Sequence, residues 1–313
     1  MTGKKGVMEF NWIFVVIIGA FILFLAIFFI GRLTGTQRYA EETELVKSFD
    51  ILLNPFASIG GIGKITLAKT IEMPQTVQIN QTCDSKEGKI TMRIRSESTI
   101  GNKWGEWSAP NNIYNKYIFS SAFMQSKRFD IMSKPFEIPY RIDDLIYILD
   151  KDYCFVNAPS NVKAELEWIN LSKLQFANSQ NECKTSSSKV CFGTACDITV
   201  TGQCSGYDCE NEYDYGYVEK SGKSMDYATP ALMYAAIFSD SKMYSCEVLR
   251  LTARLQSLAD IYKQKSIILS SEGCDTSEIQ NKLDDLKGAT TMSSIYMISK
   301  EVNSANPLSC PIF

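Results

Sequence analysis

An uninterrupted apolar run from Trp12 to Gly31 is the most prominent hydrophobic pattern in the chain. As a helix this run is about 30 Å long at about 1.5 Å per residue, which equals the hydrocarbon thickness of a bilayer. A buried helix of a globular domain normally keeps a polar face, and a cleavable secretory signal would have a shorter apolar core. The run therefore predicts a single transmembrane helix, preceded by a short cytoplasmic tip, within residues 1–34.

A helical stalk is predicted at residues 35–55, directly after this run. The segment is rich in helix-forming residues, and Leu45, Phe49 and Leu52 are spaced so that they share one face. Pro55 ends the pattern, because proline has no backbone N–H to donate to a continuing helix.

Hydrophobic residues recur at every second position in the β-rich region that we predict at residues 56–225. Ile90 and Ile94 belong to one alternating stretch, and residues 65–79 alternate in the same way. Turn-forming residues at 86–88 separate the two stretches, so a β-hairpin with one solvated face is expected. Shorter strands are expected at 113–119, 135–139, 153–156 and 197–201.

The C-terminal region, residues 226–313, has helical periodicity instead. Its apolar residues form one stripe within 242–271 and another within 276–304, with Gly273 between them. Two helices joined by a short connection pack antiparallel, and their stripes most simply cover the sheet. The predicted fold class is therefore α+β: a single N-terminal transmembrane helix with a stalk, a β-rich region, and a C-terminal antiparallel helical hairpin, stapled by disulfides.

The cysteines place the domain outside the cytoplasm. The chain has 10 of them, and all follow residue 80. An even and dense set is typical of disulfides, which persist in oxidising compartments. We therefore expect a single-pass protein of the cell membrane with a cytoplasmic N-terminus and an extracytoplasmic domain.

Five cysteines crowd into one short segment: Cys183, Cys191, Cys196, Cys204 and Cys209. Two C-x4-C pairs among them would suit a four-thiolate metal site, although zinc ribbons prefer C-x2-C. Disulfide loops are the favoured interpretation outside the cytoplasm. Since five is an odd number, at least one of these cysteines must pair outside the segment.

One disulfide is predicted specifically, between Cys246 and Cys310. In an antiparallel hairpin the start of the first helix lies beside the end of the second, so these two Cα atoms can approach within the roughly 4.4–6.8 Å that a bridge requires. Cys274, at the opposite end of the hairpin, is then left to pair with the β-rich region, through Cys83 or Cys154.

Composition excludes several classes of function. The net charge is −3, and nucleic acid needs a basic face, so nucleic acid is not expected as a partner. The chain contains 0 histidines, which removes the commonest catalytic nucleophile pairs and histidine-bound zinc. We expect no enzyme activity and no cofactor. A histidine-free hydrolase would have to use the densest acidic group, which comprises Asp143, Asp144, Asp150 and Asp152.

Two further motifs carry weak alternatives. Asp208, Glu210, Glu212, Asp214 and Glu219 imitate the ligand order of a calcium loop, but the turn glycine that such a loop requires is replaced by a tyrosine. A solvated acidic edge is the favoured interpretation of these residues.

Trp104 and Trp107 are the second such motif. They would suit a sugar-stacking pair, although tryptophans two or three residues apart more often belong to a core.

Lys4-Lys5-Gly6 before the apolar run, with Glu9 near its start, resembles the class III signal sequence of archaeal pilins and related proteins. The resemblance implies cleavage after Gly6, a mature N-terminus at Val7, and a helix that packs into a filament core. The carboxylate would then be third in the mature chain rather than the usual fifth. The alternative is that Lys4 and Lys5 are the basic flank of a membrane anchor.

The stretch 233–255 also looks like archaeal membrane-anchored surface proteins, a likeness that implies no activity. The sequence thus favours a membrane-anchored extracytoplasmic structural or interaction protein, with a pilin-like subunit as one form. Its expected partners are the lipid bilayer, through Trp12 to Gly31, and a protein partner or further copies of itself. The alternatives are an extracytoplasmic ligand- or glycan-binding module and a histidine-free hydrolase.

Overall fold

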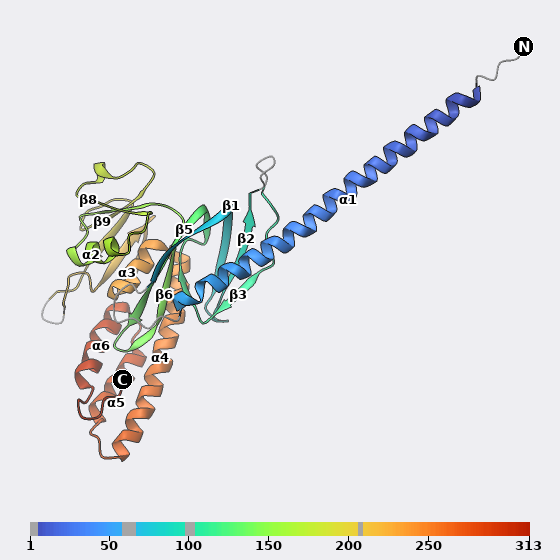
Figure 1. Ribbon diagram of the computed structural model, residues 1–313. Coiled ribbons are helices and arrows are strands. Elements are labelled where there is room, and N and C mark those ends of the chain that lie inside the picture. Colours follow the sequence, from blue (N-terminus) through green and yellow to red (C-terminus); the bar gives the residue numbers. More distant parts are fainter. Residues whose placement is uncertain (1–5, 58–66, 98–103, 206–208) are drawn as a thin grey trace, which may run out of the picture.

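The computed structural model describes residues 6–57, 67–97, 104–205 and 209–313. Within its first helix it describes the side chains of residues 15–25 and 39–53. Figure 1 shows that this helix leads away from a head built of two sheets and further helices, and that the C-terminal helices extend from the opposite side of the head.

The first sheet is mixed and has six strands in the order β3-β2-β1-β5-β6-β4. Strands β1 and β2 form the predicted hairpin, which is confirmed by antiparallel pairs that end with Asp84 opposite Lys89. Strand β4 is the exception to the antiparallel pattern, because it pairs parallel to β6. The strands are β1 (Leu67–Asp84), β2 (Lys89–Ser96), β3 (Asn111–Tyr114), β4 (Tyr117–Phe119), β5 (Phe123–Glu137) and β6 (Arg141–Leu149).

The second sheet also has six strands, in the order β12-β11-β10-β9-β7-β8. Strand β7 is parallel to both of its neighbours, β9 is parallel to β10, and the last three strands form an antiparallel meander. The strands are β7 (Tyr153–Val156), β8 (Leu174–Ala177), β9 (Ser188–Phe192), β10 (Ile198–Gly202), β11 (Tyr215–Lys220) and β12 (Lys223–Ala228).

Among the helices, α3 is the most deeply placed. All of its side chains from Ala231 to Phe238 are buried, and it packs against strands of both sheets. A helix that is apolar on every side must be enclosed by other elements, which explains its place between the sheets. The helices are α1 (Gly6–Leu53), α2 (Ser160–Trp168), α3 (Thr229–Phe238), α4 (Ser241–Ser271), α5 (Ser277–Gly288) and α6 (Met292–Ala305), with 3-10 turns at Pro55–Ala57 and Gln180–Glu182.

The first sheet is buried on both faces along β6. Along β6, Ile146 and Ile148 face a core that includes the end of α1, whereas Leu145, Tyr147 and Leu149 face a core shared with α3 and α4. Side chains of a strand point alternately to opposite faces, so one continuous apolar strand serves two cores. The end of α1 therefore lies on one side of this sheet, and α3 and α4 lie on the other.

The predicted transmembrane helix is corrected by the structure. Over the residues described, no helix combines the length and the apolar character needed to cross a membrane. This finding contradicts the transmembrane helix predicted at Trp12 to Gly31.

The helix predicted at residues 35–55 is present as the last turns of α1, which end at Leu53. The last turns of α1 do not stand free, because Val46, Phe49 and Leu53 are buried against the first sheet. The buried face is shifted by about one position from the prediction, and Leu52 remains 41% exposed.

The C-terminal helical hairpin has three helices rather than two. The predicted helix at 276–304 is interrupted between Gly288 and Met292, where a new helix begins. Thr291 starts α6 because its side chain accepts a hydrogen bond from the backbone N–H of Ser294, while the Ser294 hydroxyl accepts one from the N–H of Thr291. Helix α6 therefore folds back along α5.

This reversal explains why the predicted Cys246–Cys310 disulfide is wrong. Because α6 returns along α5, its end lies beside the start of α5, and Cys310 pairs with Cys274 at a Cα distance of 6.2 Å. Cys246 pairs instead with Cys83 of β1, at a Cα distance of 6.1 Å. That bridge joins the first sheet to α4.

All ten cysteines are in disulfides. In the crowded segment Cys183 pairs with Cys154, which lies outside the segment, as the odd number required. The remaining bridges there are Cys191–Cys196 and Cys204–Cys209. Five disulfides are typical of an extracellular domain.

Candidate functional site

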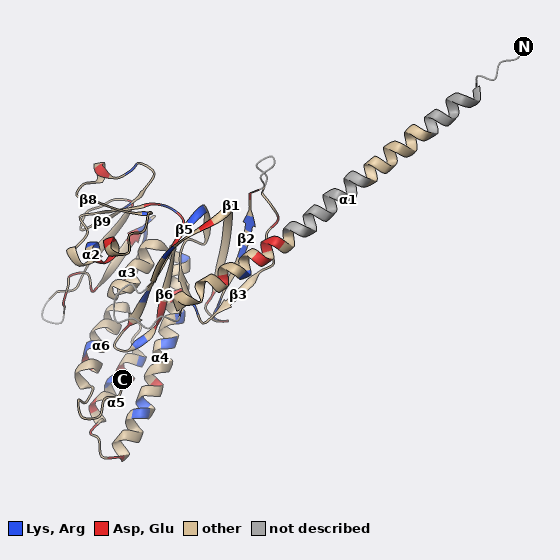
Figure 2. Ribbon diagram, viewed as in Figure 1, with Lys and Arg blue, Asp and Glu red and all other residues tan. Residues whose placement is uncertain are grey.

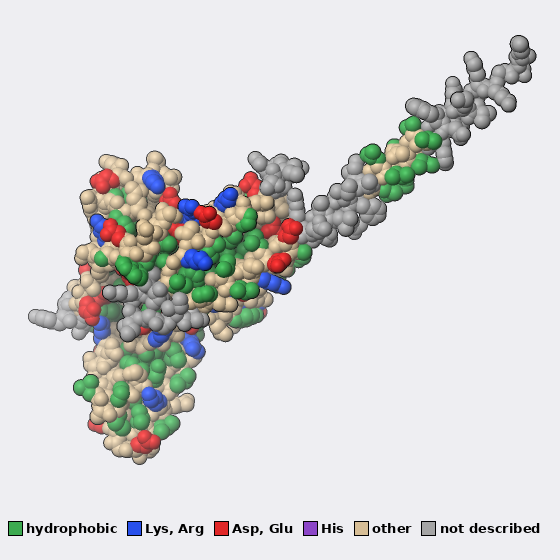
Figure 3. All heavy atoms as spheres, viewed as in Figure 1, with side chains coloured by type: hydrophobic (Ala, Val, Ile, Leu, Met, Phe, Trp, Pro, Cys, Tyr) green, Lys and Arg blue, Asp and Glu red, His purple; other side chains and the backbone are tan. Residues whose placement is uncertain are grey.

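The first described stretch of α1 carries a dense set of exposed apolar side chains. They are between 42% and 67% exposed, and they fall at consecutive positions, so they face every direction around the helix. Figure 3 shows this stretch in the colour of hydrophobic side chains, at a distance from the head. We call these residues the apolar segment: Val15, Val16, Ile17, Ile18, Phe21, Ile22, Leu23 and Phe24.

The opposite end of α1 is held to the head by an apolar contact. Phe49 is 1% exposed, and its ring meets the ring of Phe129 of β5 edge-on, with 6.1 Å between centroids. Phe56, in the turn after the helix, belongs to the same core as Leu53. Burial of such large side chains strongly favours the docked position of the helix.

Polar contacts hold the same end of α1. Glu42 is 4% exposed, and its carboxylate accepts hydrogen bonds from the backbone N–H of Ser96, at 2.8 Å, and from the Ser96 hydroxyl. About two turns further on, Asp50 forms an ion pair with Lys116, whose ammonium also donates to the Asp50 carbonyl at 3.0 Å. These bonds fix the rotation and the direction of the helix on the sheet.

Charge along α1 divides the helix in the same way. Figure 2 shows acidic residues in red where the helix meets the head, and none in the described part of the helix further out. Glu41, Glu42 and Glu44 supply this charge. The helix thus has an end that contacts its own head and an end whose side chains remain exposed to solvent.

An exposed apolar surface of this kind indicates an interaction site. Single apolar side chains on a surface are ordinary, but a contiguous group is rare on a monomeric protein and marks a surface that becomes buried. A helix that is apolar on all sides needs neighbours on all sides. Sequence reasoning located this run, but it assigned the run to a bilayer.

The acidic group considered for a hydrolase does not converge. Asp143 and Asp144 lie near the start of β6, and Asp150 and Asp152 lie after its end. Seven residues of extended strand separate Asp143 from Asp150 by roughly 23 Å, too far for a pair of catalytic carboxylates. Burial raises the pKa of Asp143 and that of Asp150, and Arg141 forms an ion pair with Asp144 at 2.6 Å.

The calcium candidate is not assembled either. Asp208 lies outside the described residues, and no group of three or more metal-binding side chains occurs in the part of the chain that is described. Asp214 accepts hydrogen bonds from the backbone N–H groups of Glu210 and Asn211, both at 3.0 Å. Its carboxylate therefore organises its own loop. The other two candidates, Glu212 and Glu219, belong to no such group.

The Trp104 and Trp107 pair is covered by a cation. The guanidinium of Arg95 lies 5.5 Å from the ring centroid of Trp104 and 4.4 Å from that of Trp107. Both distances are within the range of a cation–π interaction, so these rings make contacts within the protein.

The predicted processing site comprises Gly6, Val7 and Glu9. The surroundings of these residues lie outside what the structure describes.

Comparison with protein-family models, with curated proteins and with solved structures gives no significant match.

Proposed function

We propose that the protein is an extracytoplasmic structural or interaction protein, and that the apolar segment of α1 packs against the same segment in further copies of the chain. The observation that carries the proposal is the set of exposed apolar side chains around all sides of the helix, 42–67% exposed. The disulfides support the extracytoplasmic location.

Identical copies are the partner that fits these features best. Each helix needs apolar neighbours on every side, and in a bundle of identical copies every chain supplies the same apolar helix to its neighbours. The clamp formed by Glu42, Phe49 and Asp50 orients each helix relative to its head, so the heads can lie outside such a bundle. A pilin-like subunit is one form of this arrangement. That the protein is not an enzyme stays a prediction.

The test places a charge within the apolar segment. The mass of the oxidised full chain is measured by light scattering during size exclusion, for the wild type and for Phe21→Glu. Phe21 is 60% exposed, so the substitution removes no contact of the head. We expect the wild type to elute as a multiple of the chain mass and the variant to elute as a monomer, because a buried unpaired carboxylate is costly.

Ile51→Glu is the matched control, since Ile51 is 63% exposed on the same helix but lies next to the head. It should leave the assembly unchanged. A monomeric wild type would contradict the proposal. So would a wild-type chain that binds phospholipid vesicles and not its own copies.

A further inference from the structure

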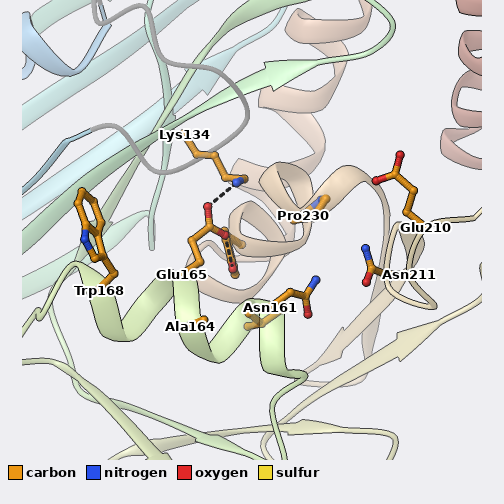
Figure 4. A pocket seen from close by; sticks show the side chains of 10 residues that line it. Lys134, Asn161, Ala164, Glu165, Trp168, Glu210, Asn211 and Pro230 are labelled. Atoms are coloured by element: carbon orange, nitrogen blue, oxygen red, sulfur yellow. Dashed lines mark hydrogen bonds and ion pairs between the residues drawn. The ribbon is translucent and has the colours of Figure 1, made fainter.

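The head contains a hollow of about 880 Å³ on the side of the first sheet that faces α3. Helix α2 forms one wall, and the buried side chains of Lys134 in β5 and Tyr234 in α3 form the floor. Glu210 and Asn211, which precede β11, form the far rim. Its volume falls within the roughly 300–1,000 Å³ of small-molecule sites. Figure 4 shows Trp168 at one end of the hollow, and Glu210 and Asn211 at the other.

Helix α2 has two distinct faces, and one of them lines the hollow. Val162 and Leu166 are 2% and 1% exposed and point into the core. Asn161, Glu165 and Trp168, at spacings of four and three, line the hollow, and Val162 also contributes to its lining. Residues at such spacings lie on one helix face, so α2 presents an amide, a carboxylate and an indole in a row.

The floor of the hollow is polar but electrically balanced. The ammonium of Lys134 donates to Glu165 Oε1 at 2.5 Å, and the hydroxyl of Tyr234 donates to Glu165 Oε2 at 2.8 Å. Tyr234 is fully buried, and burial raises the pKa of its hydroxyl well above the usual value, so the hydroxyl stays protonated and donating. Both oxygens of the Glu165 carboxylate are thus engaged, and a lysine cancels its charge.

The rim combines an exposed aromatic ring with amide groups. Trp168 is 78% exposed, which is unusual for the largest apolar side chain. Asn161 and Asn211 each offer two N–H donors and one carbonyl acceptor. Glu210, the second carboxylate of the lining, has the Lys300 ammonium at 3.9 Å.

From these features we infer that the hollow binds a neutral saccharide. The ring of a sugar has an apolar C–H face that packs on an indole, and hydroxyl groups at its edge that need both donors and acceptors. Trp168 supplies the first and the amides of Asn161 and Asn211 supply the second. Both carboxylates of the described lining are paired with a lysine, Glu165 with Lys134 and Glu210 with Lys300. These paired charges favour a neutral ligand over a charged one.

The test titrates the oxidised full chain with a panel of neutral disaccharides that contain glucose, galactose, mannose or N-acetylglucosamine. Binding is detected by saturation-transfer NMR and quantified by calorimetry. We expect at least one member to bind, and Trp168→Ala to weaken that binding by about tenfold or more, since aromatic stacking contributes on the scale of tenfold in Kd. The exposure of Trp168 makes the substitution harmless to folding, which thermal unfolding verifies.

Tyr114→Ala is the matched control, because Tyr114 is an aromatic residue that is 53% exposed at the edge of the first sheet. It should change Kd less than about twofold. Asn211→Ala is a second variant, expected to weaken binding while leaving the Trp168 ring contacts in the NMR spectrum. The inference is overturned if no disaccharide binds, if Trp168→Ala binds as well as the wild type, or if only uronic-acid disaccharides or short peptides bind.

Discussion

Replacing Phe49 by alanine tests whether α1 is seated on the head as a structural part of it. Phe49 is 1% exposed and packs edge-on against Phe129, which is 0% exposed. Removal of a buried phenylalanine side chain typically costs about 3–5 kcal/mol, because it removes apolar burial and leaves a cavity. A domain has roughly 5–15 kcal/mol of stability, so the loss is a large fraction of the total.

The free energy of unfolding is measured by urea titration, with circular dichroism and tryptophan fluorescence as separate probes. At about 2–3 kcal/mol per molar urea, the expected loss of about 3–5 kcal/mol lowers the midpoint by about 1–2.5 M. Ile51→Ala is the control on the same helix, and since Ile51 is 63% exposed its cost should stay within about 0.5 kcal/mol. Equal midpoints for the two variants would refute the seating of α1 on the first sheet.

Two further predictions concern the helical side of the head. Burial raises the pKa of the Glu247 carboxyl to about 8, although Arg250 acts in the opposite direction. Between pH 4.5, the ordinary pKa of this carboxyl, and about pH 8, the folded chain therefore holds a proton that the unfolded chain has released. Stability should therefore fall as pH rises from about 4.5 to about 8, and Glu247→Gln should flatten this fall, as measured by thermal unfolding across that range. Replacing Cys274 and Cys310 together by serine opens a loop closed across 36 residues and should cost about 4 kcal/mol in the chain-entropy model; an unchanged urea midpoint would contradict the pairing.

Local patterns in the sequence predicted the β1–β2 hairpin correctly because the alternation of the strands and the residues of the turn indicate the same structure. Ile90 and Ile94 are buried at alternating positions, and Gly88 adopts a positive φ of 65° in the turn, a conformation that glycine tolerates best. Strand β6 gave no such signal. It is buried on both faces, so apolar residues do not alternate along it, and the adjacent Asp143 and Asp144 resemble a turn.

Tertiary contacts explain the predictions that failed. The stripe predicted across 276–304 continues through a break, because both α5 and α6 present apolar faces to the same core. The start of a new helix at Thr291 is what distinguishes α5 and α6 from one continuous helix over 276–304. A capping box made of threonine and serine is a weak sequence signal for such a start. The hollow could not be predicted, since Lys134 and Glu165 meet across 31 residues of chain, and neither residue belongs to a motif.

The two candidate sites can be tested independently because the first sheet separates them. Along β5, Phe129 faces the core under α1, whereas Lys134 reaches the hollow on the other face. The position of α1 depends on the core that contains Phe129. The lining of the hollow depends on α2 and α3, which belong to the core on the other face of the sheet. A charge in the apolar segment should therefore abolish assembly without altering saccharide affinity, and Trp168→Ala should do the reverse. If Phe21→Glu also weakened saccharide binding, the hollow would depend on assembly, and neighbouring copies would have to contribute to it.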